Sequence, residues 1–405
     1  MKYLVMLGDG MADYPIESLG NRTPLEVAQK PTMDALCHAG ELGLVRTLYE
    51  GMPTGSDIAN LSVLGYDPHS CYTGRSPIEA LGLGIPLSDD DTVFRLNLVP
   101  LSEDEPFAEK AMLDHSADKI TSEEAYALTD ALQAAFGSDV IGIHRGVSYR
   151  HILIWKGIDY GYTMMPPHDI LEQKITAYLP GGPYGAQVLA MMEKSYEILM
   201  AHPVNLARIK AGKRPANCLW LWGEGTRPQI GNFYEKYGVT GAVITAVPLI
   251  QGLAAGAGLR SITVPGATGD FDTNYAGKAQ AAMDAFSAGD QFVFIHVEAP
   301  DECGHDADLE HKIRAIELID GEILTPVKAH LDAMGEPYKI LVMPDHATPI
   351  AERTHVLDPV PYVIYTKGED TGNGCDYNEK TGRASGRMIA YGHDLMAHFL
   401  SCGKD

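Results

Sequence analysis

Short apolar runs recur along the chain, and each is followed by a turn-forming or polar segment. The first, residues 3–7, stops at Gly8-Asp9-Gly10, which is typical of a buried parallel strand with a carboxylate at its C-terminal end. Later runs predict further strands, with helical stretches between most of them: 218–222, 242–245, 262–264, 292–297, 339–343 and 362–365. Alternating strands and helices predict an α/β fold, a doubly wound and mostly parallel sheet with helices on both faces.

The middle of the chain breaks this rhythm. A helix with a capping box at Thr121-Ser122-Glu123-Glu124 is followed by two strand-like segments, 141–145 and 149–155. Pro180-Gly181-Gly182-Pro183 marks the end of the region. We therefore expect two domains: a smaller α+β cap formed by residues 106–183, inserted into a discontinuous domain of residues 1–105 and 184–405. A chain of 405 residues is also too long for one ordinary core.

The segment from Met52 to Asn60 reads as a loop that enters a helix, because Pro53 and Gly55 precede apolar positions with helical spacing. Ser56 would lie at the start of that helix. Free backbone N–H groups and the positive end of the helix dipole favour an anion such as phosphate there. The same Thr-Gly-Ser-Asp pattern is also that of an ordinary helix cap, so this segment alone leaves both interpretations open.

Aspartates and histidines follow several of the predicted strands. Since ligands of open α/β sheets bind at the carboxyl edge, we expect these side chains to gather there. The candidate metal ligands are Asp9, Ser56, Asp301, His305, Asp345, His346 and His355. Alone, each of them is compatible with a cap, a turn or a solvated loop. Together they favour a metal site, and mixed Asp and His sets suit Zn²⁺ or Mn²⁺. Seven ligands are too many for one ion, so the sequence predicts two.

A helix-starting hydroxyl beside two divalent ions predicts phosphoryl transfer. One ion can lower the pKa of the Ser56 hydroxyl so that its alkoxide attacks phosphorus, and both can neutralise phosphoryl oxygens during an in-line displacement. The expected intermediate is a phosphoserine at Ser56.

Net charge and composition exclude other functions. A formal charge of −23 argues against nucleic-acid binding, and it means that a phosphate site must gather its own cations. No stretch approaches about 20 apolar residues, so we expect no membrane span and a cytoplasmic location. The six cysteines are scattered without a Cys-x-x-Cys pair, which argues against a disulfide framework or a thiolate zinc site.

Six motifs extend this interpretation over nearly the whole chain: Gly8–Asp13, Pro53–Asp57, Tyr72–Ala80, Gly266–Tyr275, Asp301–Asp306 and Pro344–Pro349. With them the sequence resembles the alkaline phosphatase superfamily, and more closely the cofactor-independent phosphoglycerate mutases of the archaeal type. The resemblance implies that Asp9, Ser56, Asp345 and His346 hold one ion and Asp301, His305 and His355 the other. It also implies manganese, with magnesium, cobalt or zinc as variants, and a cap domain that closes over the site.

Mutase chemistry would pass the phosphoryl group of 3-phosphoglycerate to Ser56 and return it to the 2-hydroxyl of glycerate. Cations must then hold the carboxylate and the phosphate, which bidentate guanidinium groups suit. Our substrate-binding candidates are Arg75, Arg145 and Arg150, followed by Asp272 and Lys278. Surface salt bridges are the alternative role of each arginine.

Two departures from the family pattern keep other functions open. Ala117-Asp118-Lys119 stands where Ala-Gly-Arg is expected, and Leu221-Trp222-Gly223-Glu224-Gly225 where relatives carry Leu-Arg-Gly-x-Gly. Lost arginines favour a different acceptor, so a homoserine phosphotransferase or a metal-dependent phosphatase is the alternative enzyme, and a metal-stabilised binding protein is a third hypothesis. A P-loop is missing, which excludes an ordinary P-loop kinase. The expected partner is a small phosphorylated molecule, neither nucleic acid nor membrane, and a homo-oligomer is left open.

Overall fold

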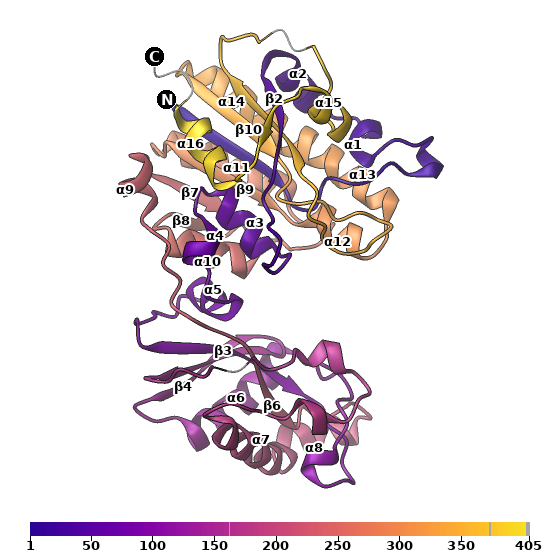
Figure 1. Cartoon of the computed structure of the whole chain (residues 1–405), viewed down its shortest axis with the longest axis vertical. Coiled ribbons are helices and arrows are strands. Elements are labelled where there is room, and N and C mark those ends of the chain that lie inside the picture. The colour runs from indigo at the N-terminus through magenta and orange to yellow at the C-terminus, as the bar shows by residue number, and fades with distance from the viewer. Residues whose placement is uncertain (162, 372–373, 402–405) are drawn as a thin grey trace. The chain divides into compact units, whose positions relative to one another are not determined.

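The computed structural model describes residues 1–161, 163–371 and 374–401. The chain divides into two compact units, which are described separately (Figure 1). Unit 1 consists of Met1–Tyr72 and Gln229–Asp405, and unit 2 of Thr73–Pro228. Among the described residues, no helix has the length and apolar character needed to cross a membrane.

The described part of unit 1 forms an eight-stranded sheet in the order β12-β2-β11-β10-β1-β9-β7-β8. Its strands are β1 (Lys2–Gly8), β2 (Glu41–Val45), β7 (Gly241–Ile244), β8 (Arg260–Ile262), β9 (Phe292–Val297), β10 (Tyr338–Met343), β11 (Val360–Thr366) and β12 (Met388–Ile389). β1 runs parallel to β9 and β10, and β11 is antiparallel to both of its neighbours. The predicted α/β class with a mostly parallel sheet is confirmed.

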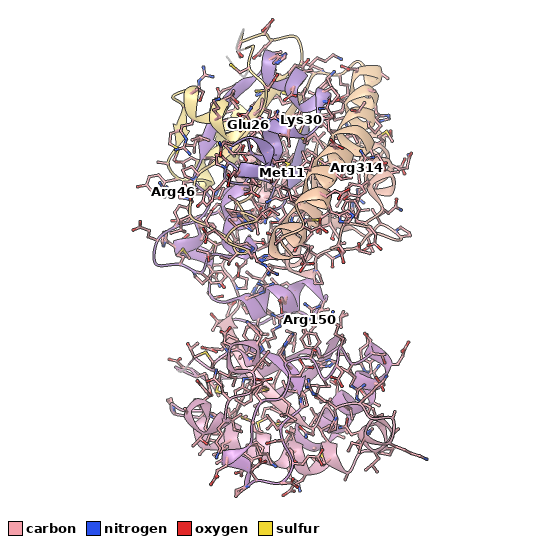
Figure 2. All side chains as sticks on the ribbon, turned by 90° about the vertical axis from the view of Figure 1, so that its right-hand side faces the viewer. Met11, Glu26, Lys30, Arg46, Arg150 and Arg314 are labelled. Carbon is pink, nitrogen blue, oxygen red and sulfur yellow. The ribbon has the colours of Figure 1, made fainter. Side chains whose placement is uncertain are left out.

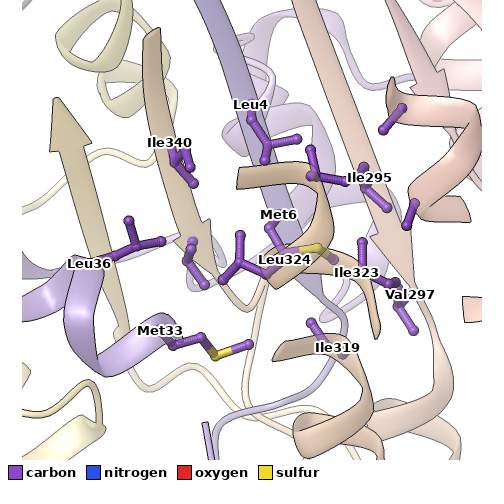
Figure 3. Packing of buried hydrophobic residues seen from close by; sticks show 14 of the residues in the cluster. Leu4, Met6, Met33, Leu36, Ile295, Val297, Ile319, Ile323, Leu324 and Ile340 are labelled. Carbon is purple, nitrogen blue, oxygen red and sulfur yellow. The ribbon is translucent and has the colours of Figure 1, made fainter. Parts of the chain in front are cut away.

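Helices cover both faces of this sheet because successive side chains of a strand point to opposite sides. Tyr3 packs against Phe399 of α16 with ring centroids 5.7 Å apart. Leu4 and Met6 point the other way, into a core that includes Met33 of α2 (Figure 3). The helices of unit 1 are α1 (Pro24–Val27), α2 (Pro31–Ala39), α3 (Ser56–Val63), α4 (Pro68–Cys71), α9 (Phe233–Tyr237), α10 (Pro248–Gly256), α11 (Tyr275–Ser287), α12 (Ala299–His305), α13 (Leu309–Leu318), α14 (Thr325–Met334), α15 (Glu379–Ala384) and α16 (His393–Ser401).

A π-helical segment, Ile319–Leu324, joins α13 to α14 and supplies Ile319, Ile323 and Leu324 to the same core (Figure 3). Its Asp320 carboxylate accepts the backbone N–H groups of Thr32 and Met33. These are donors at the start of α2 that the helix itself cannot satisfy. The segment therefore fixes α2 by polar as well as apolar contacts.

Unit 2 is built on a four-stranded antiparallel sheet in the order β4-β5-β3-β6 within its described residues. Its elements are β3 (Asp91–Val99), β4 (Ile141–Val147), β5 (Arg150–Lys156), β6 (Cys218–Thr226), α5 (Arg75–Gly82), α6 (Ser122–Phe136), α7 (Gly185–Met200) and α8 (Pro203–Lys210). The capping box at the start of α6 is present. Arg150, labelled in Figure 2, begins β5.

This unit is wider than the insertion expected at residues 106–183. β3, which we expected in the larger domain, pairs with β5 on one side and with β6 on the other. Hydrogen bonding across the sheet thus draws residues 73–105 and 184–228 into unit 2. The sequence pattern marked the change of character along the chain but not the strand pairing that sets the boundary.

Candidate metal centre

The carboxyl ends of three neighbouring strands meet at one edge of the unit 1 sheet. Gly8 at the end of β1 pairs with Val297 of β9, and Leu7 pairs with Met343 of β10. Each strand leads directly into candidate ligands, which are Asp9 after β1, Asp301 and His305 on α12 after β9, and Asp345 and His346 after β10. Parallel register therefore brings together residues that lie about 290 and 335 positions apart in sequence.

A first group gathers around the ring of His346. Its Nε2 lies 3.3 Å from Asp9 Oδ1, 3.5 Å from Asp345 Oδ2 and 3.2 Å from Ser56 Oγ. Asp9, Asp345 and His346 are fully buried. Ligands held about 2.1 Å from a metal ion are separated from one another by distances of this size.

Hydrogen bonds assign the protons of His346. The Thr348 hydroxyl donates to the Asp301 carboxylate, which can only accept. Thr348 Oγ1 also lies 3.2 Å from His346 Nδ1, so Nδ1 must carry the proton of that bond. The lone pair of His346 is then on Nε2, directed at the oxygens of Asp9 and Asp345, which is the form that binds metals.

The electrostatics of this group call for a cation. Burial, together with the neighbouring charge of Asp345, raises the pKa of Asp9 well above its usual range. Asp9 Oδ1 is buried and has no hydrogen-bond partner among the described residues. A buried acceptor without a partner is costly, and a divalent ion would satisfy it while offsetting the repulsion between the two carboxylates.

A second group consists of Asp301, His305 and His355. The two Nε2 atoms are 3.0 Å apart, and each lies 3.3 Å from an Asp301 oxygen. His305 Nδ1 lies 3.0 Å from the Arg353 carbonyl and His355 Nδ1 lies 2.8 Å from the Thr54 carbonyl. A carbonyl only accepts, so both Nδ1 atoms are protonated, which leaves each Nε2, on the side of the carboxylate, as the ring nitrogen that can bind a metal ion.

This group also favours positive charge. The bond to Asp301 raises the pKa of His305 to about 9. Although burial opposes it, bonding to His305 and His355 holds the pKa of Asp301 well below its usual range. The ligand atoms of Asp301, His346 and His355 lie within 4.8 Å of one another, which links the two groups. The donor set of the seven predicted ligands thus fits two neighbouring divalent ions.

Ser56 begins α3, but its hydroxyl does not cap the helix. The N-cap residue is Gly55, and no side chain makes a capping bond there. Asn60, one turn further along α3, donates to the Ser56 carbonyl at 2.9 Å and to Asp345 Oδ2 at 2.8 Å. Asp57 turns away from the serine, accepting the Tyr72 hydroxyl at 2.8 Å. Sequence reasoning missed Asn60, whose i+4 spacing from Ser56 was the available signal.

Gly10 is required by the crowding around Asp301. Its φ of +59° lies in the left-handed region, and a Cβ there would lie 2.5 Å from Asp301 Oδ1 and 2.5 Å from Thr348 Oγ1. Its neighbour Met11, labelled in Figure 2, is fully buried. The Gly8-Asp9-Gly10 turn therefore allows the backbone to pass close to the second ligand group.

The substrate-binding candidates of unit 2 separate into two places. Arg75 and the buried Arg95 contact the Glu79 carboxylate at 3.0 and 3.4 Å, and Arg95 lies 4.8 Å over the ring of Trp222. Although burial opposes it, the charges of Arg95, Arg75 and Arg150 hold the pKa of Glu79 below its usual value. We call Arg75, Arg95 and Arg150 with Glu79 the arginine cluster. Sequence reasoning missed Arg95, which lies between apolar residues inside β3.

Three other candidates lie outside the two ligand groups and the arginine cluster. Arg145 is exposed and pairs with Asp130 of α6. Lys278 is buried and donates to the His296 carbonyl at 2.8 Å. Asp272 is exposed, with the Thr268 hydroxyl 3.4 Å from its carboxylate. These contacts give the three residues structural partners of their own.

A family model and the similar proteins of known name all indicate the same family. The family model of 2,3-bisphosphoglycerate-independent phosphoglycerate mutase matches residues 37–205. A probable 2,3-bisphosphoglycerate-independent phosphoglycerate mutase of Geobacter sulfurreducens is 46% identical over 402 residues, covering 99% of this chain and 100% of the relative. The 2,3-bisphosphoglycerate-independent phosphoglycerate mutase of Methanosarcina barkeri is 45% identical, covering 98% of both chains.

Solved structures agree with these relatives. A protein of Pyrococcus horikoshii superposes with a TM-score of 0.82 at 32% identity, covering 98% of this chain and 96% of that one. The cofactor-independent phosphoglycerate mutase of Thermoplasma acidophilum superposes with a TM-score of 0.64 at 27% identity, covering 99% and 100%.

Proposed function

The chain belongs to the family of 2,3-bisphosphoglycerate-independent phosphoglycerate mutases, which are isomerases, and on that premise we propose that it interconverts 3-phosphoglycerate and 2-phosphoglycerate through a phosphoserine at Ser56. The observation that carries this proposal is the position of the Ser56 hydroxyl. It begins α3 without a capping role and lies 3.2 Å from His346 Nε2, within the first ligand group.

In this proposal Asp9, Ser56, Asp345 and His346 hold one divalent ion, and Asp301, His305 and His355 hold the other. When bound, the ions would lower the pKa of the Ser56 hydroxyl and neutralise the oxygens of the phosphoryl group. Manganese suits the mixed imidazole and carboxylate donors, with magnesium, cobalt or zinc as variants.

The chain's own groups would carry the transfer. Ser56 Oγ forms a bond to phosphorus as the bond from phosphorus to the C3 oxygen of 3-phosphoglycerate breaks. The glycerate then reorients, and its 2-hydroxyl oxygen displaces Ser56 Oγ from phosphorus, which restores the serine. Asn60 holds the Ser56 carbonyl and Asp345 together, so that nucleophile and ligand keep one relative position.

We further propose that the arginine cluster binds an anionic group of the substrate. Two guanidinium groups contact the Glu79 carboxylate, and the charge of a third, that of Arg150, also lowers the Glu79 pKa, which leaves an excess of positive charge in a chain of net charge −23. Arg95 is 8% exposed, and its Nε has no hydrogen-bond partner among the described residues. Guanidinium groups bind carboxylates and phosphates in bidentate fashion. Asp272 and Lys278 contribute less directly, Lys278 by supporting the end of β9.

A homoserine phosphotransferase or a phosphatase is the second candidate. The observation in its favour is Trp222, which lies under Arg95 where the family pattern has an arginine. A coupled assay for 2-phosphoglycerate separates the candidates. It uses metal-stripped protein with Mn²⁺ restored, and no 2,3-bisphosphoglycerate is added.

We expect turnover from 3-phosphoglycerate that falls at least about 10³-fold in Ser56→Ala, in keeping with the loss of a catalytic nucleophile. Ser70→Ala is the matched control, because Ser70 is an exposed serine of α4 whose hydroxyl donates to the nearby Asp67 carbonyl. Full activity of Ser56→Ala would show that Ser56 is not the nucleophile. Phosphate appearing on homoserine or in solution, without 2-phosphoglycerate, would assign the site to the second candidate.

A further inference from the structure

His296 contacts one carboxylate oxygen of the metal-ligand candidate Asp9, and His346 approaches the other. His296 is a fully buried residue of β9, and its Nε2 lies 2.9 Å from Asp9 Oδ2, whereas His346 lies beside Oδ1. The sequence conceals it, because it stands inside the apolar run 292–297. What His296 does to Asp9 depends on which ring nitrogen carries the proton.

Thr245, the residue after β7, decides that question. Its Oγ1 accepts the backbone N–H of Val247 at 3.0 Å and lies 3.3 Å from His296 Nδ1. The hydroxyl has no other hydrogen-bond partner among the described residues, so its proton is directed to Nδ1. Nδ1 is then an acceptor, and the ring proton must be on Nε2, where it is donated to Asp9 Oδ2.

The contrast with His346 supports this assignment. The hydroxyl beside His346 is that of Thr348, which has the Asp301 carboxylate to donate to and therefore accepts from the ring. The hydroxyl beside His296 is that of Thr245, and among the described residues it has no carboxylate to which it could donate. The two histidines that contact Asp9 are therefore opposite tautomers: the Nε2 lone pair of His346 faces Oδ1, and the Nε2–H of His296 faces Oδ2.

We propose that the Thr245–His296 pair is a positioning device for Asp9, in which the Nε2–H of His296 fixes Oδ2 and leaves Oδ1 to the metal ion. The proposal rests on the proposed metal site. Histidine and carboxylate groups that orient metal ligands in this way typically change metal affinity by about 10- to 100-fold when they are removed.

A third cation is the competing explanation, because His296, Asp9 and Glu298 could also hold an ion. That arrangement needs the lone pair of His296 on Nε2, 3.6 Å from Glu298 Oε2. The buried Lys278 ammonium, which donates to the His296 carbonyl at 2.8 Å, places a fixed positive charge nearby and disfavours a further cation. The two explanations therefore predict opposite positions for one proton.

Long-range ¹H–¹⁵N spectra of the full-length, metal-free protein labelled in histidine read that proton directly. We expect a single His296 tautomer with the proton on Nε2, unchanged in Thr245→Ser, which keeps the hydroxyl. Thr245→Val removes the hydroxyl at similar volume and should give a mixed or reversed tautomer. A proton on Nδ1 in the wild-type protein, or a His296 Nε2 signal that moves to a metal-bound position on addition of Zn²⁺, would overturn the proposal.

Mn²⁺ affinity measured by calorimetry without substrate gives the functional readout. His296→Leu should weaken one of two binding events by roughly 10- to 100-fold, while His296→Gln, whose amide can still donate to Asp9, should recover most of the loss. Equal affinities of both variants, whether normal or weak, would reduce His296 to a packing role. If His296→Leu does not fold, the Thr245 spectra decide. Neither measurement involves turnover, so failure here is distinct from failure of the mutase assay.

Discussion

Gly10→Ala tests whether the tight turn after β1 supports the second ligand group. The added Cβ would lie 2.5 Å from Asp301 Oδ1 and 2.7 Å from the Asp301 Cα, a backbone atom that cannot rotate away. A residue with Cβ in the left-handed region costs about 1–2 kcal/mol, and overpacking costs about 1–3 kcal/mol. We therefore expect unit 1 of the metal-free protein to lose about 2–5 kcal/mol of unfolding free energy.

Gly20→Ala is the matched control. Gly20 also has a positive φ, +69°, but no atom lies within 4 Å of the position of its Cβ. It should therefore lose only the conformational part, about 1–2 kcal/mol. The difference between the two variants isolates the steric part, and Mn²⁺ affinity should fall at least about 10-fold only in Gly10→Ala, because Asp301 is displaced.

The chain offers a convenient assay for unit 1. All three tryptophans, Trp155, Trp220 and Trp222, lie in unit 2, so their fluorescence follows unit 2 alone while circular dichroism follows both units. Gly10→Ala should shift the dichroism transition and leave the fluorescence transition in place. Equal losses in Gly10→Ala and Gly20→Ala, with Mn²⁺ affinity unchanged, would refute the reasoning.

Three further predictions use the same two signals. Mn²⁺ at about 1,000 times its Kd should stabilise unit 1 by about 4 kcal/mol; a shift of the tryptophan transition instead would place the ions elsewhere. Lys312→Met should lower the unfolding free energy of unit 1 by about 3–5 kcal/mol. The buried Asp13 carboxylate, 2.8 Å from the Lys312 ammonium, would lose its ion-pair partner. A loss below about 1 kcal/mol would contradict this. Burial raises the pKa of Glu379 from 4.5 to about 7, so its stabilising contribution is complete below pH 4.5 and is lost as pH rises through 7. Glu379→Gln should flatten the pH dependence of stability over that range, and an unchanged profile would exclude Glu379 as its source.

The sequence predicted those parts of the fold that local pattern determines. Strands buried on both faces, such as β1, β9 and β10, are mainly apolar runs that end in a turn, so both the strands and the candidate ligands after them could be predicted from the sequence. β12 consists of Met388 and Ile389 at the sheet edge, where two partly exposed residues give no such run.

Tertiary contacts account for what the sequence missed. Arg145 stays a predicted anion ligand by residue type, and its ion pair with Asp130 of α6 is a contact that no sequence spacing predicts. Lys278 is a predicted site residue just beyond the Gly266–Tyr275 motif, and its burial in α11 with a bond to the His296 carbonyl is a contact that the sequence does not predict. His296 and Arg95 were missed because each lies between apolar residues within a strand, which gives no sequence signal of a functional side chain. The fold then places each of them beside a carboxylate.

The order of strands in the unit 1 sheet has a consequence for synthesis of the protein on the ribosome. β1 emerges before the strands that pair with it, because β9 and β10 follow about 290 and 335 residues later. Unit 2 is complete at Pro228, and its sheet consists of β3, β4, β5 and β6 in the described part of the chain, so it can fold while the other half of unit 1 is still being made. The nascent segment of residues 1–72, which includes Asp9 and Ser56, must wait without these neighbours of β1 until β9 and β10 have been synthesised. Chaperone capture during synthesis should therefore concentrate on residues 1–72, the part of the chain whose partners are made last.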